Sequence, residues 1–207
     1  MGPGERIVLA EDSSELRPDH PHVVRLEARP PNQEGTGRVT LRDLVRQALR
    51  MRPDRLVVGE VRGPEVTDLL AALNTGHEGG SGTVHANAAA DVPARLEALG
   101  STAGLDRAEL HSQLAAALSV LIHLVRDRRS GLRRIAEVHV LERGPAGLVR
   151  TVPAAIWATA EEPAVRGPGW PRLARLLTSQ VIAPVPPPPP PSTAAAVGRR
   201  TGRGGAP

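Results

Sequence analysis

The chain has 207 residues and a formal net charge of +4, and each of its 26 basic residues is an arginine. The absence of cysteine excludes disulfide bonds and thiolate metal sites, and no apolar run is long enough to cross a bilayer. No secretory signal opens the sequence, so we expect a cytosolic protein.

The hydrophobic core has to be built almost without aromatic rings, because Trp157 and Trp170 are the only aromatic residues. Packing must therefore rest on Leu, Val, Ile and Ala, which suits a buried parallel sheet flanked by helices. The small positive charge and the lack of an aromatic stacking platform give little support to a nucleic-acid-binding module, so no nucleic-acid partner is expected.

The first half of the chain alternates predicted strands with predicted helices. Apolar runs bounded by Gly, Pro or charged residues predict strands at 6–10, 22–28, 56–59 and 82–86. Thr40 and Asp43 resemble a capping box, which opens a helix that ends near Arg50. Gly63–Pro64 open a second helix, and Gly76 closes it.

The second half adds helices, a strand pair and a tail. Asp91 and Asp106 are predicted N-caps of helices near 92–99 and 107–118. Two strands are predicted at 119–125 and 133–142, and a short helix at 170–177. From about residue 179, a proline run and an arginine-containing segment predict disorder. We therefore divide the chain into a disordered start (1–4), a main α/β domain (5–153), an extension with a short helix (154–182) and a disordered Pro/Arg-rich tail (183–207).

Polar side chains stand where the predicted strands end. The residues concerned are Glu11 and Asp12 after the first strand, Glu60 and Arg62 after the third, and His85 in the fourth. Carboxyl ends of neighbouring parallel strands meet at one crevice, so we expect these groups to lie together. Phosphoryl transfer to water needs a phosphate cradle, a magnesium ion and a carboxylate that orients the water. The pattern predicts the carboxylate half of a nucleotide-hydrolysing site.

Three motifs in this order carry a family resemblance. The run LVVGEVRG at 56–63 resembles the atypical Walker B strand of the type II/IV secretion ATPases, TGHEGGSGTVHAN at 75–87 their His box, and IVLAEDSSEL at 7–16 their Asp box. The stretch 22–55 is similar to the tight-adherence (TadA/CpaF) branch. The resemblance covers roughly residues 5–150 and implies a RecA-like P-loop NTPase core, followed by a C-terminal strand pair and the disordered tail.

The resemblance also implies roles for the acidic residues. Glu60 would be the Walker B glutamate, which acts on water or on magnesium. Glu11 and Asp12 would be the Asp-box carboxylates that help to position water and metal. The cofactors implied are ATP and Mg²⁺, with the metal reached through Glu60 and Asp12.

The remaining implied roles belong to basic residues. His85 would sense the γ-phosphate, His77 would support it, and Arg62 would couple the site to a neighbouring subunit. Arg46, Arg50 and Arg52 match a basic stretch before the Walker B strand, and none of them receives an individual role.

Simpler roles stay open for the same residues. Glu60 could be an ordinary acid at a strand end, Glu11 and Asp12 could only cap the next turn, and His85 could be a hydrogen-bonded core histidine. A zinc site around His77 and His85 is disfavoured, because the Gly-rich spacing fits no helical ligand pair and no cysteine is present.

The motif that would grip the phosphates does not occur in the sequence. No G-x-x-x-x-G-K-[ST] run and no lysine occur in the 207 residues. In the family this P-loop lies upstream of the Asp box, on a central strand, so we expect its neighbouring strands to show unpaired edges. A truncated gene product, a mis-called start codon and a fragment completed by another chain would each explain the sequence, and we expect no activity from the chain alone.

Two functional hypotheses follow. In the first, the chain is part of a secretion or pilus-assembly ATPase, a hexameric ring on the cytoplasmic face of the inner membrane that drives a membrane platform protein. In the second, it is a non-catalytic interaction subunit that keeps only the ring-forming and platform-docking surfaces.

Overall fold

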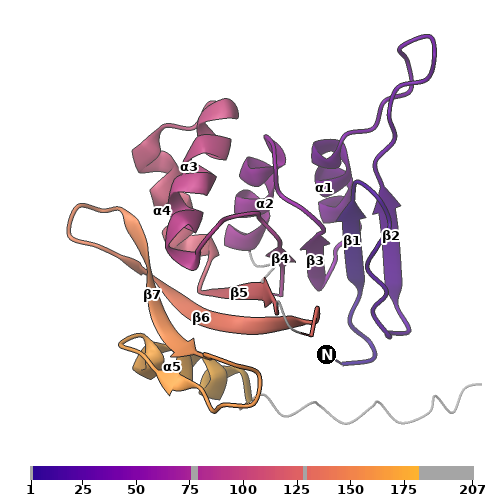
Figure 1. Cartoon of the computed structure of the whole chain (residues 1–207). Helices are drawn as coiled ribbons and strands as arrows, with labels where there is room; N and C mark the ends of the chain where they lie inside the picture. Colours follow the sequence, from indigo (N-terminus) through magenta and orange to yellow (C-terminus); the bar gives the residue numbers. More distant parts are fainter. Residues whose placement is uncertain (1, 76–78, 128–129, 182–207) are drawn as a thin grey trace, which may run out of the picture.

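The computed structural model describes residues 2–75, 79–127 and 130–181, which form two β-sheets and a layer of helices (Figure 1). The first sheet is parallel, in the order β2-β1-β3-β4. Its strands are β1 (Ile7–Glu11), β2 (Val23–Glu27), β3 (Arg55–Val58) and β4 (Ser81–Gly82). The predicted parallel α/β sheet is confirmed.

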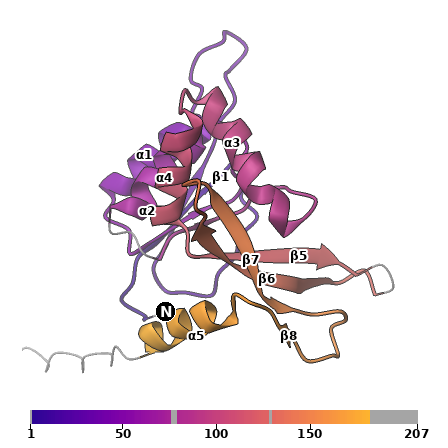
Figure 2. The ribbon, with the colours of Figure 1, turned by 90° about the vertical axis from the view of Figure 1, so that its left-hand side faces the viewer.

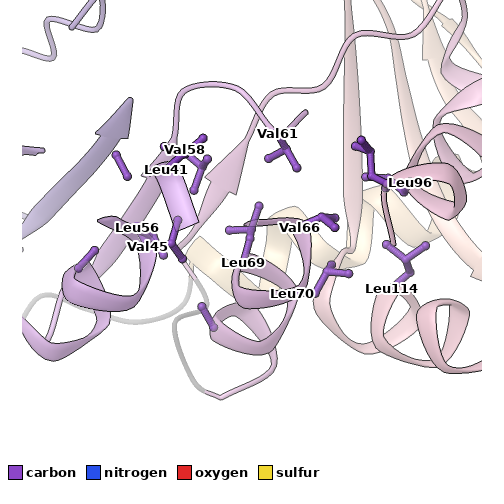
Figure 3. Close-up of a cluster of buried hydrophobic side chains, with 14 of the residues drawn as sticks. Leu41, Val45, Leu56, Val58, Val61, Val66, Leu69, Leu70, Leu96 and Leu114 are labelled. Carbon is purple, nitrogen blue, oxygen red and sulfur yellow. The ribbon is translucent and has the colours of Figure 1, made fainter. Parts of the chain in front are cut away.

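Four helices form one layer, whose first helix packs against this sheet and whose last two contact the second sheet (Figure 1). They are α1 (Leu41–Arg50), α2 (Glu65–Asn74), α3 (Val92–Thr102) and α4 (Arg107–Ala117), with a 3₁₀ turn at Ala89–Asp91 before α3. In the core, Val58 of β3 and Leu69 of α2 lie in the same buried cluster as Leu114 of α4 (Figure 3). The buried apolar residues are Leu, Val, Ile and Ala, as composition predicted.

Two of the three predicted N-cap residues make a side-chain capping bond. Thr40 and Asp43 form a reciprocal capping box at the start of α1. Asp106 accepts a hydrogen bond from the Glu109 backbone N–H at the start of α4. Asp91 precedes α3 but makes no side-chain capping bond, because its own backbone is already helical and belongs to the 3₁₀ turn. Asp91 therefore stands at the predicted N-cap position of α3 without the side-chain bond of a capping residue.

The strand predicted at 82–86 was also wrong in extent. Strand β4 contains only Ser81 and Gly82, which pair with Val57 and Val58 of β3. Strand β3 ends at Val58, so the residues after Gly82 have no strand residues opposite them with which to pair. His85 therefore lies beyond the strand. The Gly76 helix stop falls outside the described residues, and α2 ends at Asn74.

Strand β3, which carries the Walker B-like sequence, has partners on both sides. Strand β1 pairs with it along Ile7–Ala10, and the short β4 pairs with its last two residues. The outer strands of the sheet are β2 and β4, and each has one edge without a strand partner among the described residues. That the missing P-loop strand would pair with one of these edges stays a prediction.

The C-terminal strand pair is part of a larger antiparallel sheet in the order β5-β6-β7-β8. Its strands are β5 (Val120–Arg126), β6 (Arg133–Arg143), β7 (Val149–Ile156) and β8 (Val165–Arg166), and helix α5 (Trp170–Val181) follows them. Strand β7 runs through residue 153, where the sequence placed a domain boundary. The predicted disordered tail, 183–207, lies outside the described residues.

The second sheet is covered differently on its two faces. Leu141 and Val149 face the main core with α3 and α4, whereas Val140 and Ala154 pack with Leu173 of α5. Figure 2 shows α5 beneath the sheet, on the side opposite to the helical layer. In the described part of the chain, every helix is too short or too polar to span a membrane.

Candidate active site

Four ionisable side chains form a continuous line of contacts at the carboxyl edge of the parallel sheet. Asp12 Oδ2 lies 2.6 Å from Arg62 Nη2, and Arg62 Nη1 lies 3.7 Å from Glu60 Oε2. Glu60 Oε1 lies 3.5 Å from His85 Nε2. Acids and bases therefore alternate along this line, which joins the segments after β1, β3 and β4.

The register of the sheet explains why Asp12 and Glu60 meet. Ala10 of β1 is the register partner of Val58 of β3. Asp12 and Glu60 each follow this pair by two residues, so they lie side by side. The Gly59 N–H donates to the Ala10 carbonyl at 2.9 Å, which keeps the two chain ends together past the last paired residues.

Glu11 has a different environment from the other predicted site residues. Its side chain is 3% exposed, and its Oε1 accepts hydrogen bonds from the Glu15 and Leu16 backbone N–H groups, both at 3.0 Å. Its Oε2 is buried and has no hydrogen-bond partner among the described residues. A Cβ at position 59 would lie 2.9 Å from Glu11 Cγ, so Gly59 makes room for this carboxylate. Glu11 thus shapes the turn that carries Asp12.

Two residues that the sequence did not single out hold the segment around Glu60. Glu65 Oε1 accepts hydrogen bonds from the backbone N–H groups of Arg62 and Gly63. Thr83 donates its hydroxyl to the Gly59 carbonyl, and its own carbonyl accepts the Val61 N–H at 2.7 Å. A carboxylate in the first turn of a helix was a visible signal for Glu65. Nothing local signalled the role of Thr83.

The ion pair with Asp12 further favours the protonated form of Arg62, which any arginine has at neutral pH. The hydrogen bond and the charge of Asp12, followed by the charge of Glu60, raise the pKa of Arg62 above its ordinary value. The Arg62 side chain is 56% exposed, so these contacts order it more than they stabilise the fold.

The other predicted basic residues lie elsewhere. His77 is outside the described residues. Arg46 donates to Asp68 Oδ1 at 2.8 Å and Arg42 donates to Asp68 Oδ2 at 2.7 Å, which ties α1 to α2 rather than to the line of contacts.

A pocket of about 550 Å³ opens beside Asp12 and Arg62. Its walls come from the segments that follow β1, β2 and β3 and from the first turns of α1 and α2, the position at which open α/β sheets bind ligands. The arginines that line it are Arg29, Arg38, Arg42 and Arg62, against the acids Asp12 and Glu65. This excess of positive charge favours an anionic ligand.

The carboxylates fit a magnesium ion that is shared with a nucleotide. No group of three His, Asp or Glu side chains able to hold a metal ion occurs in the described residues. Mg²⁺ in nucleotide sites uses one or two carboxylates, with phosphate and water completing its shell. Asp12 and Glu60 already share one cationic group, the Arg62 guanidinium, which shows that they can serve a common positive charge.

Comparison with known proteins finds relatives that belong to secretion and conjugal transfer systems. The family model described as "Type II/IV secretion system protein" matches residues 2–160. A Mycobacterium tuberculosis H37Rv protein whose name refers to conjugal transfer is 67% identical over 152 residues, 73% of this chain and 43% of the relative. Conjugal transfer protein TrbB of Rhizobium radiobacter is 33% identical over 140 residues, 68% of this chain and 40% of the relative.

A solved structure shows the same core. The crystal structure of the VirB11 ATPase from the Brucella suis type IV secretion system matches with a TM-score of 0.56 and 27% identity, over 68% of this chain and 42% of that one. The chain spans less than half the length of each of these relatives. With its RecA-like α/β core, the chain belongs to the type II/IV secretion system protein family.

Proposed function

We propose that this chain carries the carboxylate half of an ATP-hydrolysing site in a secretion ATPase. The observation that carries the proposal is the line of contacts from Asp12 through Arg62 and Glu60 to His85, at the carboxyl edge of parallel strands. ATP with Mg²⁺, when bound, would supply the phosphoanhydride bond and a metal ion that neutralises phosphate charge.

Each residue in this line would have a distinct task. The Glu60 carboxylate is partly open to solvent, so it can orient a water molecule and accept its proton. Asp12 would bind the metal ion or one of its water ligands. Arg62 would reduce the electrostatic repulsion between the two carboxylates. His85, whose side chain is 86% exposed, can turn toward a phosphate while it stays within reach of Glu60.

The phosphate grip would come from a segment outside these 207 residues. Backbone N–H groups of a Gly-rich loop, together with its lysine, provide most of the binding energy for nucleotide phosphates. The sequence contains neither that loop motif nor a lysine. Productive nucleotide binding would therefore need this chain to be joined to, or assembled with, a segment that carries the loop.

The wider role follows from the family. We propose a motor of the TadA/CpaF branch that forms a homo-hexamer, or joins full-length subunits, and docks on a platform protein at the cytoplasmic face of the inner membrane. Relatives named for conjugal transfer and a solved ATPase of a type IV secretion system support a secretion machine in general. The pilus-assembly assignment rests on the similarity of residues 22–55 described above.

A fusion experiment tests the proposal. The part of the M. tuberculosis relative that precedes the matched region is joined to this chain, and ATP turnover and ATP-dependent thermal shift are measured for both proteins. We expect neither signal from the chain alone and both from the fusion. Robust turnover by the chain alone would contradict the proposal. A folded fusion without turnover would favour the non-catalytic interaction subunit instead.

A further inference from the structure

We propose that Glu65 is a positioning residue that holds Arg62 against Asp12 and Glu60. Glu65 is the first residue of α2, and its side chain is only 5% exposed. Its importance for turnover rests on the function proposed above, whereas its effect on Arg62 does not.

The Glu65 carboxylate is directed at the backbone that follows Glu60. Its Oε1 accepts the Arg62 N–H at 2.8 Å and the Gly63 N–H at 2.7 Å. A Cβ at position 63 would lie 2.9 Å from Glu65 Oε2, so the carboxylate packs closely on this turn. The Glu65 carboxylate makes its hydrogen bonds to backbone N–H groups that precede α2, and its charge also helps to raise the pKa of Arg62.

This arrangement solves a problem of conformational entropy. Arg62 has a long and largely exposed side chain, and exposed ion pairs offset little more than the entropy lost in holding such a chain still. The backbone N–H groups of residues 62 and 63 donate hydrogen bonds to a buried carboxylate, which fixes the backbone there. The Cα–Cβ bond of Arg62 then has one fixed direction, so the guanidinium contacts Asp12 and Glu60 at a lower cost in conformational entropy.

A purely structural helix cap would make a different prediction. Asp106 supplies the matched comparison, because its carboxylate accepts the Glu109 N–H at the start of α4 and has no contact with the line of charged residues. If Glu65 only stabilised its helix, Glu65→Ala and Asp106→Ala would have the same consequences. If Glu65 positions Arg62, only Glu65→Ala would release the guanidinium.

The test is NMR of the ¹⁵N-arginine-labelled full chain, with the Arg62 guanidinium signals assigned from the spectrum of Arg62→Gln. We expect resolved Arg62 Nη signals in the wild type and in Asp106→Ala, and loss of those signals in Glu65→Ala. Glu65→Gln keeps an acceptor oxygen but not the charge, so it should give an intermediate result and guard against a misfolded alanine variant. Unchanged Arg62 signals in folded Glu65→Ala and Glu65→Gln would overturn the proposal.

The same variants in the fusion protein separate this inference from the proposed function. We expect Glu65→Ala to lower kcat by at least about 10-fold with KM within about 2-fold, because misplacing a catalytic group acts on the chemical step. Loss of Arg62 order in a fusion that never turns over ATP would support the positioning role and refute the function. Turnover that is unaffected by Glu65→Ala would refute the importance of Glu65 for turnover and leave the proposed function standing, while the effect on Arg62 is decided by the NMR signals.

Discussion

His111 shows how one buried side chain joins a helix to the second sheet. The ring is 2% exposed, and its Nδ1 accepts the Val149 N–H of β7 at 2.8 Å. Its Nε2 must therefore carry the proton, and it donates to Glu97 Oε1 of α3 at 2.6 Å. Glu97 also accepts a hydrogen bond from Arg107. The hydrogen bonds from His111 and Arg107 outweigh burial and hold the pKa of Glu97 below its ordinary value.

The depressed pKa of Glu97 predicts a pH-dependent contribution to stability. A carboxylate whose pKa is lower in the folded state stabilises the fold above its unfolded pKa of about 4.3, and this stabilisation is lost as the pH falls through the folded value. We expect Glu97→Gln to be less stable than wild type at neutral pH and to approach it in acid. Urea unfolding across this pH range measures the difference. Glu109→Gln, an exposed change on α4, should show no such convergence, and a constant deficit for Glu97→Gln would contradict the assignment.

The sequence predicts which acidic residues stand at the strand ends. It does not predict which residues support them by hydrogen bonds. Asp12 and Glu60 follow apolar runs in the sequence, so the pattern itself places them at one edge of the sheet. Glu65 and Thr83 act by hydrogen bonds to backbone groups of a turn. The position of Glu65 in the first turn of a helix is a local signal, but the partners of its bonds, and the role of Thr83 altogether, depend on how the turn closes in three dimensions.

Helices α3 and α4 meet at a glycine. Gly100 lies in the interior of α3, and a Cβ there would stand 2.8 Å from Leu110 Cδ1 of α4. Leu110 is 1% exposed, so it has little freedom to move away. The two helices can approach this closely because position 100 lacks a side chain.

Gly100→Ala has two opposite effects on the free energy of unfolding, one from helix propensity and one from packing. Alanine favours a helix interior by about 1 kcal/mol over glycine, whereas overpacking a core costs about 1–3 kcal/mol. We expect a net loss of stability, measured as a lower urea midpoint. Ser101→Ala, on the exposed side of the same helix, should give no loss. An equal gain from both variants would show that the helix contact can relax.

Elements with local signals were predicted better than elements that depend on distant partners. The capping box at Thr40 and the cap at Asp106 lie within four residues of their partners, and both are confirmed. Strand 82–86 shrank to Ser81–Gly82 because the length of a strand depends on where its neighbour β3 ends.

On the scale of the whole molecule, the second sheet leaves one apolar region uncovered. Strand β5 is the outer strand of this sheet, and α5 covers only the part that includes Val140. The exposed large apolar residues on β5 and the facing part of β6 are Val120, Ile122, Leu124 and Ile135. Arg126, the last residue of β5, is the only charged side chain of this strand, and an outer strand whose other exposed residues are apolar invites edge-to-edge association.

Lysine substitutions on β5 should therefore reduce self-association. We expect Ile122→Lys with Leu124→Lys to lower the concentration-dependent light scattering of the purified chain, because charge opposes pairing at a sheet edge. Leu177→Lys changes a residue of α5 with the same 57% exposure as Ile122 and should have little effect. Equal scattering by all three proteins would mean that β5 is not the adhesive surface.

The sequence predicted the parallel sheet more completely than the antiparallel one. Strands β1, β2 and β3 are short apolar runs whose alternation with helices signals their class. Strand β7 contains Pro153, which lacks the N–H that a ladder uses, and β8 has only two residues. Both belong to the sheet through pairing with β6 and with each other, so the strand pair could not be extended from local pattern alone.

The most direct test of the central claim is ATP turnover by the fusion protein with Glu60→Gln. Glu142→Gln is its matched control, because Glu142 has the same partial exposure and also contacts an arginine, but lies in β6 away from the parallel sheet. If Glu60 orients the attacking water, Glu60→Gln should lower kcat by at least about 100-fold, whereas Glu142→Gln should leave it unchanged. Turnover by Glu60→Gln equal to that of the control would contradict a catalytic site at the carboxyl edge of the sheet.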